Sequence, residues 1–285
     1  MAATQAGPMA PASLAVLADW ASSTPVAPSL TWTSAGALAL TAVLAGAINS
    51  VAGGGSFLTF PALIYFGVTP KIANTTNTVA VWFGSLASVG AYRRQLGGQR
   101  RALVTLLITS LVGGLLGALL LLGTPDATFK RLLPWLMLTA TLIFIFGKYL
   151  TAWLRREVHL DITQPRHAGP FIAGCVLQLV IAVYGGFFGG GMGILMLALL
   201  TLLGYEEIHA MNALKTVLGA TINGIAVVAF IAARMVDWPQ ALVMIAGSII
   251  GGYGGAVIAQ KVNGEVIRRL VMAVGLGMTL YFFVR

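Results

Sequence analysis

Two glycine runs in apolar surroundings are the stretches of this sequence best suited to chemistry. They are Val51-Ala52-Gly53-Gly54-Gly55-Ser56-Phe57 and Phe187-Phe188-Gly189-Gly190-Gly191-Met192-Gly193. Each glycine in a helix interior costs roughly 1 kcal/mol relative to alanine, so both runs predict breaks between helical segments. A short helix that begins after such a break, near Ser56 or Gly193, would direct free N–H groups and a positive dipole end into the protein. Such helix ends bind anions.

One lysine is predicted to lie near the same depth as the breaks. Lys215 falls inside the apolar stretch 208–233, roughly 10 Å along a helix axis from its start. Two interpretations stay open. The amine can extend along its own stem to the membrane interface, or it can face a buried site. The repeat described below pairs Lys215 with Asn77, so only one of the two halves would supply a charge.

Neutral hydrogen-bonding side chains accompany the lysine, and no carboxylate falls inside a predicted span. Each amide or hydroxyl alone is typical of contacts between membrane helices, worth ~1 kcal/mol or less. Together with two helix ends and one cation, they predict a small-anion site and argue against a cation site. The predicted substrate-binding residues are Asn49, Gly53, Gly54, Gly55, Ser56, Asn74, Asn77, Thr78, Gly189, Gly190, Gly191, Asn212, Lys215 and Thr216.

The composition predicts an integral membrane protein. Of 285 residues, 58% are hydrophobic and 9% charged, against about 25% charged in soluble domains. The net charge of +9 does not indicate nucleic-acid binding, because the basic residues fall in short loops between apolar runs. There is no nucleotide-binding G-x-x-x-x-G-K-[ST] or zinc-binding H-E-x-x-H motif, and Cys175 is the single cysteine. We therefore expect no cofactor, no metal and no enzymatic activity.

The apolar runs are long and do not alternate, so the predicted fold is an all-α, polytopic transmembrane helix bundle. A loosely ordered tail (1–32) precedes a membrane repeat (33–150), a polar cytoplasmic connector (151–169) and a second repeat (170–285). The predicted helices are 33–52, 56–66, 72–92, 102–122, 132–150, 170–188, 193–203, 208–233, 241–259 and 266–284.

The two halves of the chain match one another. Asn74–Val79 aligns with Asn212–Val217, and Ser110–Gly114 aligns with Ser248–Gly252, both at an offset of 138 (212 − 74 and 248 − 110). The glycine runs align at 136 (189 − 53). Such duplications are common in transporters, where interrupted hydrophobic segments at matching positions indicate the binding site.

The distribution of basic residues predicts how the repeats are oriented. No lysine or arginine precedes Lys71, which predicts an external N-terminus, and the arginine-rich loop 93–101 should be cytoplasmic. Both conditions hold if 33–66 forms a hairpin that re-enters its own side, and the repeats are then inverted. Parallel repeats are the alternative, and they leave fewer basic residues inside.

Several of these residues resemble the TauE/SafE sulfite exporters of the sulfonate-uptake-permease group. The resemblance rests on Gly53–Pro61, Ala73–Thr78 and a basic loop before a glycine-rich span, then on Gly189–Gly191, Asn212–Val217 and Val236–Pro239. It extends from about Ala35 to the C-terminus. It implies a bacterial inner-membrane transporter of sulfite, organosulfonates or related oxyanions. The second half differs, with Met192-Gly193 after the glycines and no proline in its short segment, so the two half-sites are not expected to be equivalent.

The leading hypothesis is a transporter that binds a small sulfur-containing anion at mid-membrane between the two repeats, in the cell inner membrane. Its expected partners are that anion and the lipid bilayer, without nucleic acid, and a homo-oligomer is left open. An anion channel on the same scaffold and a non-transporting membrane scaffold are the alternatives.

Overall fold

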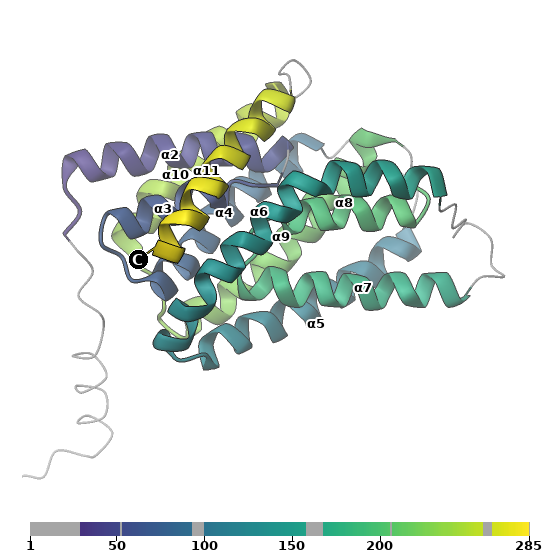
Figure 1. Cartoon of the computed structure of the whole chain (residues 1–285), viewed down its shortest axis with the longest axis horizontal. Coiled ribbons are helices and arrows are strands. Elements are labelled where there is room, and N and C mark those ends of the chain that lie inside the picture. The colour runs from purple at the N-terminus through teal and green to yellow at the C-terminus, as the bar shows by residue number, and fades with distance from the viewer. Residues whose placement is uncertain are drawn as a thin grey trace, which may run out of the picture.

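The computed structural model describes residues 29–51, 53–92, 100–157, 168–205, 207–258 and 264–284, and within them every regular element is a helix. The all-α prediction is confirmed. Figure 1 shows the helices as one elongated bundle. In chain order they are α2 (Trp32–Val51), α3 (Ser56–Tyr65), α4 (Pro70–Tyr92), α5 (Arg100–Gly123), α6 (Asp126–Glu157), α7 (Ala168–Phe187), α8 (Met192–Leu202), α9 (Ile208–Ala232), α10 (Trp238–Ile258) and α11 (Gly264–Val284).

The largest difference from the predicted helices is α6. It runs from Asp126 to Glu157, whereas 132–150 was predicted, so Thr151–Glu157 belongs to a helix and not to the polar connector. These residues (Thr-Ala-Trp-Leu-Arg-Arg-Glu) include good helix formers, and polarity alone does not end a helix. The rest of the predicted connector up to His167, and the N-terminal tail up to Pro28, lie outside the described residues.

Among the described residues, five helices are long and apolar enough to cross a membrane, namely α2, α5, α6, α9 and α10. Shorter apolar segments occur in α3, α7, α8 and α11. Helix α4 has 23 residues, which is the length of a span, but its polar start at Asn74–Thr78 lowers its hydropathy. Large apolar side chains such as Leu120 and Ile250 are exposed along these helices, as expected for surfaces that face lipid. The chain is a multi-pass membrane protein.

Small residues set the closest helix contacts. Helix α2 packs mainly on α10, and α5 on α7. A Cβ atom on Gly251 of α10 would lie 1.9 Å from the Val43 carbonyl oxygen, and one on Gly113 of α5 would lie 2.7 Å from the Leu179 carbonyl oxygen. Glycine lets two backbones approach this closely, which drives helix association in lipid.

Two contacts join positions that the predicted repeat pairs, although the repeat itself stays a prediction. The indole N–H of Trp82 donates to the Ala220 carbonyl at 2.9 Å, and the hydroxyls of Thr141 and Thr279 lie 3.3 Å apart, in each case between residues 138 positions apart. In Figure 1, α2 begins at the left of the view and α7 begins at the right, so these two corresponding helices run in opposite directions. Inverted repeats require that opposition, whereas parallel repeats do not.

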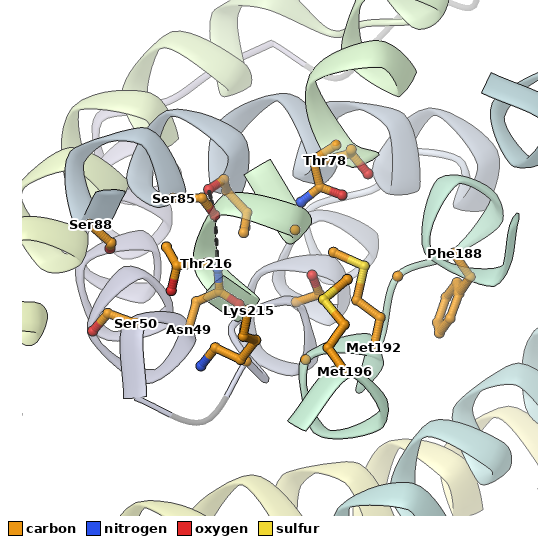
Figure 2. A pocket seen from close by; sticks show the side chains of 17 residues that line it. Asn49, Ser50, Thr78, Ser85, Ser88, Phe188, Met192, Met196, Lys215 and Thr216 are labelled. Carbon is orange, nitrogen blue, oxygen red and sulfur yellow. Dashed lines mark hydrogen bonds between the residues drawn. The ribbon is translucent and has the colours of Figure 1, made fainter. Parts of the chain in front are cut away.

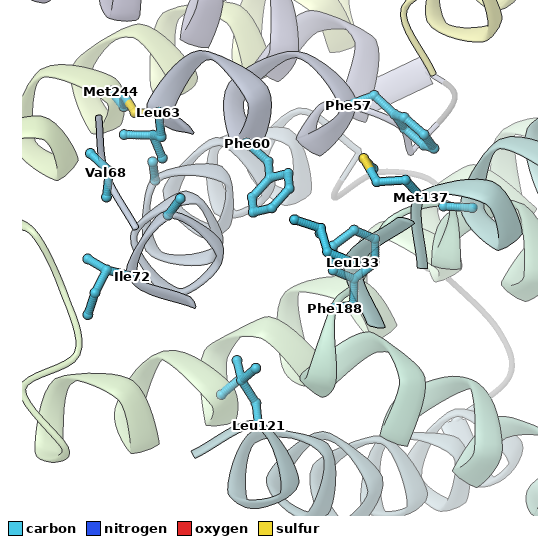
Figure 3. Close-up of a cluster of buried hydrophobic side chains, with 14 of the residues drawn as sticks. Phe57, Phe60, Leu63, Val68, Ile72, Leu121, Leu133, Met137, Phe188 and Met244 are labelled. Carbon is cyan, nitrogen blue, oxygen red and sulfur yellow. The ribbon is translucent and has the colours of Figure 1, made fainter. Parts of the chain in front are cut away.

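An aromatic cluster positions the first short helix. Figure 3 shows Phe57 and Phe60 of α3 within a buried apolar core that also includes Leu133, Met137 and Phe188. The Phe60 and Phe188 rings meet edge to face with centroids 5.8 Å apart, a geometry that adds about 0.5–1.5 kcal/mol to the burial itself. The end of α7 and the start of α3 are thereby fixed to one another.

Candidate functional site

The two predicted breaks meet. Gly53 and Gly189, the first glycines of the two runs, both have left-handed backbones, with φ of +75° and +79°. A Cβ on Gly53 would lie 3.0 Å from Gly193 Cα, and a Cβ on Gly193 would lie 3.1 Å from Gly53 Cα. The backbones of the two runs are therefore in direct contact, and a side chain at either position would separate them.

Both short helices begin at this crossing, as predicted. Helix α3 starts at Ser56, and α8 starts at Met192. Several early N–H groups are used by the turns themselves, since Phe57 donates to the Gly54 carbonyl at 3.1 Å and Ile194 donates to the Gly191 carbonyl at 3.0 Å. The backbone N–H groups that can contact a ligand are therefore those of Ser56 and Gly193, because both residues line the adjoining cavity.

That cavity is the centre of the site (Figure 2). The space inside the cavity that the centres of water-sized spheres can reach is about 30 Å³. This is room for about two water molecules. In this conformation the cavity is narrow. None of the described residues around it is acidic. They are Asn49, Ser50 and Gly53 at the end of α2; Ser56 of α3; Thr78, Val81, Ser85 and Ser88 of α4; Phe188, Gly189, Met192, Gly193 and Met196 at the second break; and Lys215, Thr216, Gly219 and Asn223 of α9.

Lys215 lines this cavity and is only 3% exposed. Its stem packs on the second break, because a Cβ on Gly193 would lie 3.4 Å from Lys215 Cδ. Of the two interpretations of this lysine, the geometry favours the one in which the amine faces a buried site. Its repeat counterpart Asn77 lies outside the cavity and accepts a hydrogen bond from the Thr59 hydroxyl.

Most of the hydroxyl groups around the cavity donate to carbonyls of their own helices. Thr78 and Thr216 donate to carbonyls of their own helices at 2.8 and 2.7 Å, and Ser50 and Ser88 do likewise at 2.8 and 2.9 Å. These bonds direct the hydroxyl hydrogens away from a ligand. The amide and ammonium groups of the lining, together with the Ser56 hydroxyl, are then the candidate donors for an anion.

Two amides supply those neutral donors. Asn49 Nδ2 donates one hydrogen to the Ser85 hydroxyl at 3.0 Å, and an amide nitrogen carries a second hydrogen. The Ser85 hydroxyl donates in turn to the Val81 carbonyl at 3.0 Å, which fixes the orientation of Asn49. Asn223 lies one helical turn beyond Gly219 on the same face of α9 and also lines the cavity.

The structure separates the predicted site residues into two groups. Asn49, Gly53, Ser56, Thr78, Gly189, Lys215 and Thr216 line the cavity, whereas Gly54, Gly55, Asn74, Asn77, Gly190, Gly191 and Asn212 do not. The inner glycines pack against other parts of the protein. A Cβ on Gly54 would lie 2.3 Å from Phe144 Cζ, and a Cβ on Gly55 would lie 2.4 Å from the Ala45 carbonyl oxygen.

The polar start of α4 mainly connects elements. Asn74 Nδ2 donates to the Phe187 carbonyl at 3.0 Å, where α7 ends. The Thr76 hydroxyl accepts from the Asp237 N–H at 3.0 Å, and the Thr75 hydroxyl donates to the Met235 carbonyl. These bonds fasten the break and the α9–α10 loop to α4, so only Thr78 of this stretch reaches the cavity.

Gly193, expected from the sequence at a helix start, also lines the cavity. Sequence reasoning missed most of the other lining residues, although part of their signal is present. Ser85 and Ser88 follow Thr78 at helical spacing, so one face of α4 carries a row of hydroxyls. An apolar wall formed by Phe188, Met192 and Met196 gave no such signal, because methionine and phenylalanine are ordinary in any membrane helix.

A bundle of membrane helices with two broken segments that meet at a buried polar cavity has the architecture of a secondary transporter. The chain belongs to the family of the sulfite exporters TauE/SafE, whose match covers residues 38–282. The family predicted from the sequence is thereby confirmed.

The relatives found are named as transporters. The chain is 31% identical over 237 residues to a probable membrane transporter protein of Haemophilus influenzae, covering 83% of this chain and 89% of the relative. It is 29% identical over 245 residues to the probable membrane transporter protein ORF9 of a Sinorhizobium species, with coverages of 85% and 90%. It is 31% identical over 246 residues to the probable membrane transporter protein YfcA of Escherichia coli K12, with coverages of 86% and 87%. No solved structure matches the chain significantly.

Proposed function

We propose that this membrane transporter carries a small sulfur-containing oxyanion, sulfite or an organosulfonate, across the cell inner membrane, and that the anion binds in the cavity between the two breaks. The observation behind this proposal is the position of Lys215, a buried cation beside two helix starts in a cavity with no acidic residue among its described lining. A charge inside a membrane protein marks an ion pathway by default.

The proposed ligand contacts use donors that line the cavity. The Lys215 ammonium supplies the charge, Asn49 and Asn223 supply amide hydrogens, and Ser56 and Gly193 supply backbone N–H groups at helix starts. A tetrahedral or pyramidal oxyanion has several acceptor oxygens and suits donors that converge from different helices. Phe188, Met192 and Met196 would contact the apolar part of a sulfonate. For passage, one repeat would rock against the other about the crossing at Gly53 and Gly193.

Counterflow in proteoliposomes tests the function and the role of Lys215 together. Liposomes loaded with unlabelled sulfite or a short sulfonate should accumulate the labelled anion, and Lys215→Ala should lower the rate at least tenfold, since the only cation described in the cavity is lost. Sulfite, sulfonates, sulfate and thiosulfate should be compared. Full transport by Lys215→Ala would contradict the site, and no counterflow of any of these anions by the wild-type protein would contradict the function.

Lys71 provides the matched control. It is also a largely buried lysine, but it lies outside the cavity, where its Nζ donates to the Leu122 and Thr124 carbonyls at 3.0 and 2.8 Å and lies 3.8 Å from an Asp126 oxygen. Lys71→Ala should lower thermal stability while leaving the affinity of the folded protein for the anion unchanged. A fall in anion affinity as large as that of Lys215→Ala would show that loss of any buried lysine is enough.

A further inference from the structure

We infer that Met192 sets the size of the largest anion that the cavity accepts, because its side chain ends an apolar part of the cavity against Gly219. This inference rests on the proposed function and deepens it, since it names the size class of the anion. Sulfite and the shortest alkanesulfonates bind, and longer alkanesulfonates are rejected. The inference starts from the division of the cavity into a polar and an apolar part.

The polar and the apolar residues of the cavity lie at different ends of it. In Figure 2, Asn49 and Lys215 lie at the left of the view. Met192, Met196 and Phe188 lie at the right. An alkanesulfonate has the same division, with charged oxygens at one end and a hydrocarbon chain at the other. When the oxygens bind the amide and ammonium donors, the chain is directed toward the methionines.

The Met192 side chain lies across this apolar end. Met192 is the first residue of α8 and follows Gly191, whose φ is +77°, so the second break positions it. A Cβ on Gly185 of α7 would lie 2.6 Å from Met192 Sδ, and a Cβ on Gly219 of α9 would lie 3.7 Å from Met192 Cε. The thioether therefore extends from α8 to both α7 and α9.

Gly219 leaves the space that the methyl group of Met192 occupies. The predicted repeat pairs Gly219 with Val81 (219 − 81 = 138), and both residues line the cavity. Where α4 carries a branched side chain, α9 carries none, and Met192 Cε is the nearest atom of another helix to a Cβ placed there. Met192 and Gly219 together thus define where the cavity ends.

The free space explains why this end limits the size of the ligand. The cavity has room for about two water molecules, which is comparable to one compact oxyanion. A longer hydrocarbon chain must displace Met192, which belongs to the same buried apolar cluster as Ile181 of α7 and Ile222 of α9. One methylene group too many in an apolar pocket lowers binding by about 10–200-fold.

The test is competition during counterflow in proteoliposomes that contain the full-length protein, with labelled sulfite or methanesulfonate as the tracer. The competitors are the unlabelled linear alkanesulfonates from methanesulfonate to pentanesulfonate, which keep one charge and differ only in length. For the wild type, the inhibition constant should rise at least tenfold at one step of the series. Met192→Ala removes the thioether and should move this rise to a chain about two carbons longer.

Two further variants separate a size limit from a general effect on the structure. Gly219→Ala adds a methyl group at an ordinary contact distance from Met192, and it should move the rise to a chain about one carbon shorter. Met192→Leu nearly conserves the side-chain volume and should keep the rise within about one carbon of the wild type. Loss of structure alone does not shift the limit in opposite directions.

The chain offers a matched control for each substitution. Met137 of α6 is a buried methionine outside the cavity, and Gly277 of α11 is a helical glycine with nothing within 4 Å of an added Cβ. Met137→Ala and Gly277→Ala should leave the dependence of the inhibition constant on chain length as it is in the wild type.

Each result has one meaning. An unchanged dependence on chain length in Met192→Ala and Gly219→Ala would overturn the inference and leave the proposed function in place. The same holds for a wild type that binds all the alkanesulfonates equally, for failure of every alkanesulfonate to compete in the wild type and in Met192→Ala, and for an equal shift in Met137→Ala. If Met192→Ala does not fold, Gly219→Ala decides. Absence of all anion transport by the wild type would overturn both proposals.

Discussion

At the scale of single residues, the two halves of the molecule use corresponding positions for different tasks. On the matched helices α4 and α9, three corresponding pairs line the cavity together, namely Thr78 with Thr216, Val81 with Gly219, and Ser85 with Asn223. The fourth pair, Asn77 and Lys215, is divided, since one member fastens α3 to α4 and the other faces the cavity. The predicted repeat thus carries one charge at this pair of positions and not two, which suits a single monovalent ligand better than a symmetric pair of cations would.

Sequence reasoning could find the lysine and Asn49 but could not decide which of the other predicted amides reach the cavity. Five successive polar residues from Asn74 to Thr78 cover every face of a helix, so their side chains must point toward several neighbours. Only the rotation of α4 within the bundle decides which of them reaches the cavity, and that rotation depends on packing far away in the sequence. Lys215 is the one charge inside an apolar stretch, which left it either at the membrane interface or in the protein interior. Its burial in the structure decides for the interior.

Glu207 gives a pH-dependent prediction at the residue scale. Its carboxylate, ahead of α9, accepts from the N–H of His209 at 2.8 Å and from that of Ala210, and these backbone hydrogen bonds lower the pKa of Glu207 below its usual 4.5. A lowered pKa in the folded state stabilises the protein above the unfolded pKa, and the effect is lost as pH falls through the folded pKa.

We therefore expect Glu207→Ala to lower the melting temperature in detergent at pH 7, with a loss that shrinks below pH 4.5 toward the folded pKa. Thermal melts at several pH values measure it. Glu207→Gln is the control, since it keeps acceptor oxygen without the charge and should retain part of the cap at every pH. A difference between wild type and Glu207→Ala that stays constant with pH would contradict the role of the charge.

At the scale of helices, glycine spacing was the most informative feature of the sequence. The ends of α2 and α7 and the starts of α3 and α8 could be predicted because three glycines together are costly in a helix. The true length of α6 could not, because its final residues are polar and a drop in hydropathy does not mark the end of a helix. The sequence also could not predict which helices pack against one another, because apolar helix faces have similar hydropathy.

Two glycines of α10 allow a matched prediction about helix packing. A Cβ on Gly251 would lie 1.9 Å from the Val43 carbonyl oxygen of α2, whereas nothing lies within 4 Å of a Cβ on Gly254. We expect Gly251→Ala to destabilise the protein by about 1–3 kcal/mol through overpacking. Gly254→Ala should be neutral or stabilise by up to about 1 kcal/mol through helix propensity.

Thermal unfolding of both variants in the same detergent checks this prediction. Equal melting temperatures for Gly251→Ala and Gly254→Ala would mean that α2 and α10 are not in close contact in the folded protein. Because the two positions share one helix and receive the same substitution, a general effect of alanine on α10 cannot produce the expected difference.

At the scale of the whole molecule, the opposite directions of α2 and α7 in Figure 1 favour inverted repeats. In that arrangement, a rotation about an axis in the membrane plane relates one half to the other, so corresponding loops lie on opposite sides of the membrane. The charge pattern of the loops favoured the same arrangement only slightly, because few basic residues distinguish the inverted and parallel models.

Sided labelling tests the orientation of the repeats. Thr69 and His209 are exposed residues at the starts of α4 and α9, and these starts correspond in the repeat. With Cys175 replaced by serine, Thr69→Cys and His209→Cys should react with a membrane-impermeant maleimide from opposite sides of the membrane. Reaction of both from one side would establish parallel repeats. A permeabilised sample, in which the maleimide reaches both sides of the membrane, is the control that shows each cysteine to be reactive.

The contact between Gly53 and Gly193 also bears on how sequences of this family can diverge. Lipid-facing positions such as Ile250 can exchange one apolar side chain for another without affecting any neighbour in the protein. The two glycines have no such freedom, since a side chain on either meets the backbone of the other. Each half of the chain therefore restricts the other at this point, and the two glycines are expected to change only together.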